Sequence, residues 1–180
     1  MPTYICILRG INVSGQKIIK MDALRKSFEE MKFKNVRTYI QSGNVLFESK
    51  EISNTSLEKQ IQKKLLQDYG FHVPVLVKET KNLKSAVKNN SFIDRKNIDI
   101  DRLYVTFLAE KPSQTNIDKI TPEQYAPDEF ILSGNIVYLY CPGGYGNTKL
   151  SNNFFENKLK VVATTRNWKT VNELIRLSEL

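Results

Sequence analysis

The order of apolar and polar residues over the first 80 positions predicts alternating strands and helices. Tyr4 to Leu8 is a continuous apolar run, which is typical of a buried strand. Apolar residues then recur at helical spacing from Met21 to Met31. The pattern Thr55-x-x-Glu58 predicts a capping box at the start of a second helix, which Gly70 would end. The expected elements are strand 3–9, helix 21–32, strands 36–41 and 45–47, helix 55–70 and strand 73–77.

The second half predicts a similar series that contains a longer loop. Three prolines between residues 110 and 127 indicate a loop with at most short helical turns. Asn153-x-x-Glu156 is a second capping-box pattern. The expected elements are a short helix near 83–87, strand 102–108, hairpin strands 130–132 and 136–140, a glycine-rich segment over 141–147, and helices at 152–160 and 168–178.

The two predicted hairpins, residues 39–47 and 130–138, share one pattern. Each reads aromatic, Ile, any residue, Ser-Gly-Asn, β-branched, aliphatic, aromatic. The repeat indicates a diverged duplication, although Ser-Gly-Asn also suits any tight hairpin because Gly and Asn tolerate positive φ. The sequence therefore predicts an α+β fold of two related ferredoxin-like (βαββα-type) halves, 1–80 and 81–180, with antiparallel sheets and flanking helices, the second half having an extra C-terminal helix. If the halves pack as one unit, the cleft between them is the expected ligand site.

The cysteines and the apolar segments of the chain indicate where in the cell the protein is expected. Cys6 and Cys141 are expected to be buried thiols in a reducing compartment, because disulfide frameworks belong mainly to short secreted chains. Met1 to Tyr4 leads directly into a strand without a signal-like segment, and no apolar run approaches the roughly 20 residues of a membrane helix. We therefore expect a cytoplasmic protein with no membrane association.

The net charge of the chain bears on the kind of partner that it could bind. The formal net charge of +8 favours anionic partners. The lysines are scattered along the chain rather than grouped, so a solvated basic surface accounts for the charge equally well.

Three polar segments are candidates for binding an anion. The loop from Arg9 to Lys17 joins a strand to a helix, where backbone N–H groups can meet an anion, and it can equally be an ordinary connection. Glycines over 141–147 allow close approach of a ligand or of the other half of the chain. The segment from Thr164 to Lys169 combines two cations with an aromatic ring, or simply an N-cap, a core tryptophan and exposed charges. The candidate ligand-binding residues are Arg9, Asn12, Lys17, Tyr39, Asn44, Thr148, Lys149, Arg166, Trp168 and Lys169.

Several kinds of chemistry are disfavoured. His72 is the only histidine, so the chain offers neither a zinc-ligand cluster nor a Ser-His-Asp arrangement with a Gly-x-Ser-x-Gly elbow. No metal site is predicted, and cofactors and catalytic residues are unknown. The third predicted strand, Asn44 to Glu48, offers only Phe47 as an aromatic and lacks the motif of an RNA-recognition module, so that assignment is rejected as well.

Four motifs in this order resemble the bacterial family known as domain of unknown function 1697. The motifs are Tyr4–Val13, Tyr39–Val45, Asn147–Leu150 and Ala163–Thr170, and Ser14 stands where the family is expected to have glycine. The resemblance covers nearly the whole chain and implies a cytoplasmic α+β protein. It implies no activity, cofactor or catalytic residue.

Three hypotheses for function follow. The first is non-catalytic binding of a phosphate-bearing ligand, nucleotide or nucleic acid. The second is an enzyme for a small anionic metabolite, in which Tyr39 acts as acid or base and the substrate is held by Arg9, Lys17, Lys149 and Arg166. The third is a protein-interaction module, and a homodimer is a related hypothesis because open sheet edges invite pairing.

Overall fold

The computed structural model describes residues 1–180 and divides into two compact units. Unit 1 comprises Met1–Lys84 together with Leu174–Leu180, and unit 2 comprises Ser85–Glu173. Each unit contains a four-stranded antiparallel sheet with flanking helices. The predicted α+β class and the two similar halves are confirmed. No helix combines the length and apolar character that a membrane span requires.

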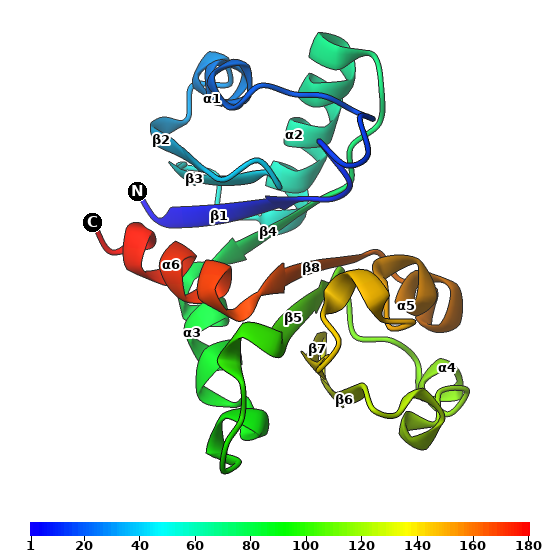
Figure 1. Cartoon of the computed structure of the whole chain (residues 1–180). Coiled ribbons are helices and arrows are strands. Elements are labelled where there is room, and N and C mark those ends of the chain that lie inside the picture. Colours follow the sequence, from blue (N-terminus) through cyan, green and yellow to red (C-terminus); the bar gives the residue numbers. More distant parts are fainter. The chain divides into compact units, whose positions relative to one another are not determined.

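Unit 1 follows the order β-α-β-β-α-β. Its elements are β1 (Thr3–Leu8), α1 (Met21–Glu30), β2 (Lys34–Tyr39), β3 (Asn44–Glu48), α2 (Asn54–Tyr69) and β4 (Val75–Glu79). The sheet order is β2-β3-β1-β4, so β2 and β4 are the edge strands. Figure 1 shows α1 and α2 on the same side of this sheet. The element order and strand order are those of the split βαβ motif.

The core of unit 1 follows from strand alternation. Tyr4, Cys6 and Leu8 of β1 point to the helices, because successive side chains of a strand face opposite sides of a sheet. Leu24 and Phe28 of α1 meet them at helical spacing. α2 adds three buried residues at the same spacing, namely Leu57, Ile61 and Leu65. The periodicities read from the sequence therefore place the helices correctly.

Unit 2 repeats the topology with a longer first connection. Its strands are β5 (Leu103–Leu108), β6 (Glu129–Ser133), β7 (Ile136–Tyr140) and β8 (Ala163–Asn167), in the sheet order β6-β7-β5-β8. Between them lie only short helical turns, α4 (Gln114–Ile117), η3 (Pro122–Tyr125) and η4 (Tyr145–Asn147), and the helix α5 (Asn152–Leu159). The predicted proline-rich loop with short turns is confirmed.

The remaining elements are helical. They are α3 (Thr80–Lys88), η1 (Ser91–Asp94), η2 (Ile100–Arg102) and α6 (Trp168–Ser178). Strand β8 was not predicted, because Ala-Thr-Thr-Arg-Asn has no apolar alternation, and the second half is therefore βαββαβ rather than βαββα. Its residues Thr164 and Arg166 are nonetheless buried.

Both capping-box predictions are wrong. Ser53 caps α2 and Ser151 caps α5, each accepting a hydrogen bond from the backbone N–H three residues later. Glu58, expected to cap α2, instead accepts the backbone N–H of Val77 at 2.8 Å. Val77 lies on the edge strand β4, so this carboxylate satisfies an N–H group that no neighbouring strand reaches. Glu58 therefore bonds to a strand that is distant in sequence instead of to the start of its own helix.

The two Ser-Gly-Asn turns occupy equivalent places but differ in geometry. The first connects Tyr39 to Asn44 through four residues, so Asn44 opens β3 instead of lying in the turn. The second connects Ser133 to Ile136 through Gly134 and Asn135 only. The N–H groups of Leu8 and Leu108 donate to Gly43 O and Asn135 O respectively, each at 2.9 Å. Gly43 is therefore equivalent in space to Asn135, one residue away from the match that the sequence pattern suggests.

Candidate functional site

Asn12 holds the loop between β1 and α1 in place. Its side-chain amide donates to Ile19 O and Gln41 O, both at 2.9 Å, and its Oδ1 accepts from Ile19 N at 2.8 Å. The residue has φ 54, a left-handed conformation that asparagine tolerates well. Three short bonds to backbone groups fit a structural role for this candidate residue.

The two candidate cations of the same loop differ in exposure. Arg9 follows β1 directly and is half-buried, and its backbone N–H donates to Pro74 O at 2.9 Å. Lys17 is exposed, and its Nζ donates to His72 O at 2.8 Å. Lys17 therefore braces the loop against the segment that leads into β4.

Tyr39 and Asn44 face each other across the end of the β2–β3 hairpin. Asn44 is fully buried, and its amide donates to Tyr39 O at 3.0 Å and to Ser42 Oγ at 3.2 Å. Tyr39 is half-exposed on the edge strand β2. The burial of Asn44 and its bonds within the turn also fit a structural role.

The glycine-rich segment of unit 2 is held by bonds within that unit. The N–H of Gly144 donates to Cys141 O, the N–H of Tyr145 donates to Tyr104 Oη, and Thr148 Oγ1 donates to Asp128 Oδ2 at 2.6 Å. A β-carbon on Gly144, which has φ +87, would come within 3.0 Å of the Arg102 guanidinium. The absence of a side chain at Gly144 therefore leaves room for the Arg102 side chain. Lys149 follows this segment and is exposed.

Cys141 is predicted to resist thiol reagents in the folded protein. Burial raises the pKa of its thiol to about 11, with the nearby Asp128 charge adding to the rise and a hydrogen bond with Thr148 opposing it. Since the thiolate is the reactive form, Ellman's reagent at pH 8 should modify neither buried cysteine before denaturant is added. Fast modification of the native protein at a rate typical of a free thiol would contradict this.

The third candidate segment mixes buried and exposed side chains. Arg166 is 7% exposed, and its Nη1 donates to Thr164 Oγ1 at 3.1 Å and Thr165 O at 2.9 Å. Trp168 is also 7% exposed, at the start of α6. Lys169 is exposed and pairs with Asp101 at 2.7 Å, and that hydrogen bond raises its pKa. Asn167 Oδ1 accepts the N–H of Thr170 at 2.7 Å, so Asn167 caps the helix.

The candidate residues divide between the units. The five from Arg9 to Asn44 lie in unit 1, and the five from Thr148 to Lys169 lie in unit 2. The expectation that Arg9, Lys17, Lys149 and Arg166 share one pocket stays a prediction.

A pocket lined with lysines lies at the end of the β2–β3 hairpin away from its turn. It has a volume of about 400 Å³, and its lining includes Lys32, Lys34 and Lys50 together with Met1, Met31, Phe33, Ser49, Glu51 and Gln60. None of the three lysines makes an ion pair or a side-chain hydrogen bond within the chain. We call the three the hairpin lysines. None of them is in contact with a carboxylate of the chain.

The one carboxylate of this pocket is engaged elsewhere. Glu51 accepts the N–H of Ser53 at 2.8 Å and the hydroxyl of Ser56 at 3.1 Å, both at the start of α2. These bonds lower the pKa of Glu51, the one from Ser53 most strongly. The pocket thus combines three unpaired ammonium groups with a carboxylate that is already satisfied.

Sequence reasoning missed this pocket because its lysines belong to two separate segments. Lys34 lies in β2, whereas Lys50 follows β3. The register pairs Lys34 with Glu48 at this end of the hairpin, and Lys32 and Lys50 lie two residues beyond these positions and line the same pocket. The hairpin pattern together with the lysine positions contains this signal.

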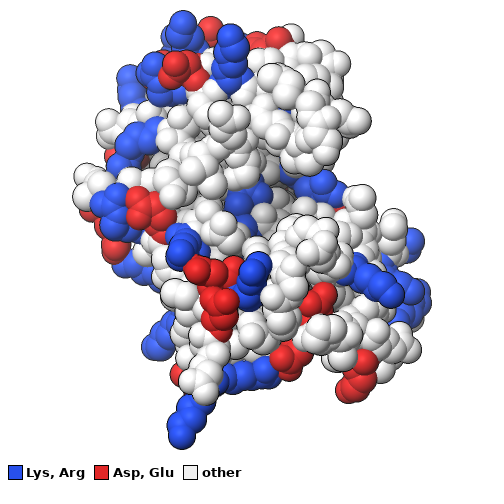
Figure 2. Space-filling view, viewed as in Figure 1, with Lys and Arg blue, Asp and Glu red and all other residues white.

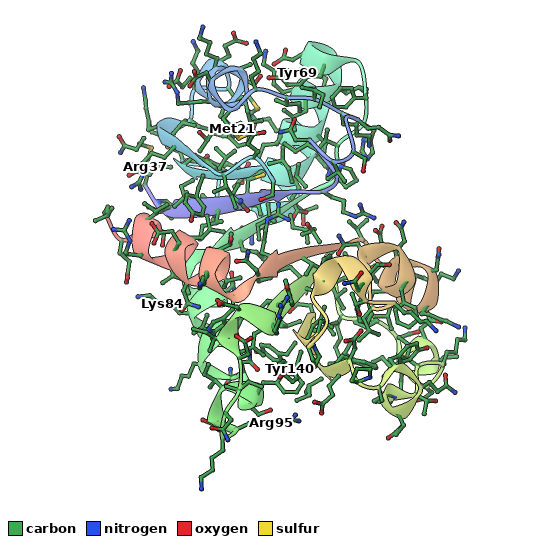
Figure 3. The ribbon with its side chains drawn as sticks, viewed as in Figure 1. Met21, Arg37, Tyr69, Lys84, Arg95 and Tyr140 are labelled. Atoms are coloured by element: carbon green, nitrogen blue, oxygen red, sulfur yellow. The ribbon has the colours of Figure 1, made fainter.

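The positive charge of the chain is concentrated in unit 1. Unit 1 contains sixteen Lys and Arg against nine Asp and Glu, a net charge of +7, whereas unit 2 contains eleven against ten, a net of +1. Figure 2 shows blue side chains along the side of unit 1 where α1 and β2 lie in Figure 1, with a few acidic ones between them. Arg37, labelled in Figure 3, extends from β2 on this side. The charge is therefore a property of one unit.

Comparison with known protein families shows to which family the chain belongs. The family described as "Protein of unknown function (DUF1697)" matches residues 1–138. The chain belongs to this family. The resemblance to DUF1697 is thereby confirmed over residues 1–138, a range that contains the first two of the four motifs and all three hairpin lysines.

A solved structure shares the fold of this DUF1697 protein. It is described as the structure of conserved bacterial protein SP0830 from Streptococcus pneumoniae, and it is 21% identical with a TM-score of 0.72. The match covers 98% of each chain, so both units have counterparts there. At this identity the likeness shows the fold alone. No curated protein matches the sequence.

Proposed function

We propose that this DUF1697 protein binds phosphate-bearing polyanions through unit 1, with nucleic acid as the main ligand class. The observation that carries the proposal is the net charge of +7 on unit 1 against +1 on unit 2. A surface with one dominant sign attracts a polyanion and speeds encounter with it. Lysine contacts to phosphates displace condensed counterions, which supplies most of the sequence-independent affinity.

The hairpin lysines are the part of unit 1 best suited to hold a phosphate group. Three ammonium groups line one pocket of about 400 Å³, and no carboxylate of the chain pairs with them. An ammonium that already has a carboxylate partner must give it up to bind phosphate, as Lys64 would with Glu30 and Asp68. The hairpin lysines carry no such cost.

The test is oligonucleotide binding as a function of salt. We expect fluorescence anisotropy with a labelled single-stranded oligonucleotide to give an affinity that falls steeply between 50 and about 200 mM salt. In the triple variant K32Q/K34Q/K50Q the affinity at low salt should drop about tenfold or more, and the slope of log K against log salt should become shallower by about 2, because about 0.7 counterion is lost per phosphate contact.

The matched control is K96Q/K111Q/K158Q in unit 2, which removes the same charge from three exposed lysines. It should retain most of the affinity and slope of the wild type. Equal losses in both triple variants would mean that only total charge matters, which contradicts the assignment to unit 1. A flat isotherm for DNA and RNA at low salt, with the protein folded, would remove nucleic acid as the ligand.

A further inference from the structure

Lys78 lies in an apolar setting on the face of the unit 1 sheet opposite α1 and α2. Its neighbours Val75 and Val77 on β4 belong to the core beneath the helices, so Lys78 points to the other side. The strand register places it directly opposite Ile5 of β1, which is fully buried, and Leu76 on the same face of β4 is 2% exposed. Lys78 itself is only 9% exposed. A charged side chain is therefore nine-tenths buried beside aliphatic ones.

The ammonium of Lys78 has no acceptor from the chain. It carries three N–H donors, yet it makes neither a hydrogen bond nor an ion pair with another residue. Burial lowers the pKa of Lys78, opposed only by the Glu58 charge, and burial likewise raises the pKa of Glu58. Both groups shift toward their neutral forms, so their mutual attraction does not offset their desolvation. Glu58 is moreover bonded to the N–H of Val77 at 2.8 Å.

The same position of the unit 2 sheet also holds a buried cation. Lys78 pairs with Ile5, next to the pair of Tyr4 with Glu79, and Arg166 pairs with Val105, next to the pair of Tyr104 with Asn167. Arg166 is 7% exposed, and the chain supplies acceptors for its guanidinium. Because arginine keeps its proton and is no nucleophile, the property common to both positions is positive charge.

We propose that Lys78 anchors a binding site for a small phosphate group on this face of the unit 1 sheet. A buried ammonium is stabilised when an anion supplies the hydrogen-bond acceptors that the protein does not. Lys78 keeps 9% of its surface exposed, and a small anion would reach it there. The site is separate from the hairpin lysines, because Lys78 lies on the edge strand β4 and Lys34 on the opposite edge strand β2. The proposal therefore does not need the nucleic-acid function.

Thermal unfolding in inorganic phosphate tests the site. Ionic strength is held constant with chloride, and the full chain is compared with K78M and K78R. At phosphate concentrations about tenfold above the dissociation constant, we expect the wild-type midpoint to rise by about 2 °C or more, since a ligand of the folded state raises stability. K78M should lose the rise, and K78R should keep part of it. K32Q/K34Q/K50Q should keep all of it.

Oligonucleotides distinguish a free phosphate from one that belongs to nucleic acid. If Lys78 takes only a free phosphate group, K78M should bind oligonucleotides as the wild type does, and a loss in K78M would assign the site to nucleic acid. A second measurement follows the Nζ titration of Lys78 by NMR, where phosphate should move the midpoint to higher pH. A phosphate effect of equal size in the wild type and K78M, or none in either folded protein, would overturn the proposal.

Discussion

Replacing Gly43 with alanine is expected to destabilise the protein by about 3 kcal/mol. A β-carbon at Gly43 would come within 2.7 Å of Ile11 Cδ1 and 2.9 Å of Leu8 Cβ. Both neighbours are fully or almost fully buried, so neither can move aside without disturbing the core. The backbone at Gly43 also has φ +87, where any L side chain is strained.

The matched control is Gly134→Ala in the equivalent turn of unit 2. Gly134 has φ +61, but a β-carbon there meets no atom within 4 Å. Only the backbone strain applies, so we expect a loss of about 1 kcal/mol. Urea unfolding of the two variants gives both numbers. Equal losses in G43A and G134A would show that packing against Ile11 contributes nothing.

Replacing Asn12 with alanine is expected to cost about 2 to 3 kcal/mol. The change removes three hydrogen bonds and leaves Ile19 N, Ile19 O and Gln41 O without these partners. It also places alanine at φ 54, a conformation that asparagine adopts more readily. The loop between β1 and α1 should then lose its attachment to the hairpin turn, which amide hydrogen exchange at Ile19 would detect.

Asn147→Ala is the control for this variant. Asn147 is an exposed loop asparagine whose side chain makes one bond, to Gly143 O at 2.9 Å. Its loss should cost under about 1 kcal/mol. Because Asn12 was also a candidate ligand residue, oligonucleotide affinity should be measured at a temperature where N12A is folded. If N12A loses much more affinity than its unfolded fraction accounts for, Asn12 contacts the ligand.

Local patterns predicted the elements because each depends on residues close in the chain. The spacing of Met21, Leu24 and Phe28 fixes the buried face of α1, and the run from Tyr4 to Leu8 fixes β1 as a strand buried on both faces. Strand β8 was not predicted because its buried residues Thr164 and Arg166 are polar. Its pairing with β5 is a long-range contact that no local pattern encodes.

The roles of the candidate site residues were harder to predict than the elements, because these roles depend on contacts between residues that are distant in sequence. The sequence pointed to Asn12 and Asn44 as polar residues in loops, but whether their amides meet a ligand or the backbone depends on where Gln41 and Tyr39 lie. Arg166 was selected as a cation, and its burial was not expected. Lys78 was overlooked because a lysine after three apolar residues reads as the end of a strand.

The amino-acid sequence alone predicted the strand and helix order except for β8, together with the approximate duplication, the family and the net charge, since these follow from composition and from motifs of a few residues. Only the tertiary structure showed that the charge lies mainly in unit 1, that Lys32, Lys34 and Lys50 line one pocket, and that Lys78 and Arg166 occupy equivalent places. Strand register brings together side chains that are distant in the chain, and it also decides which of them lose contact with water.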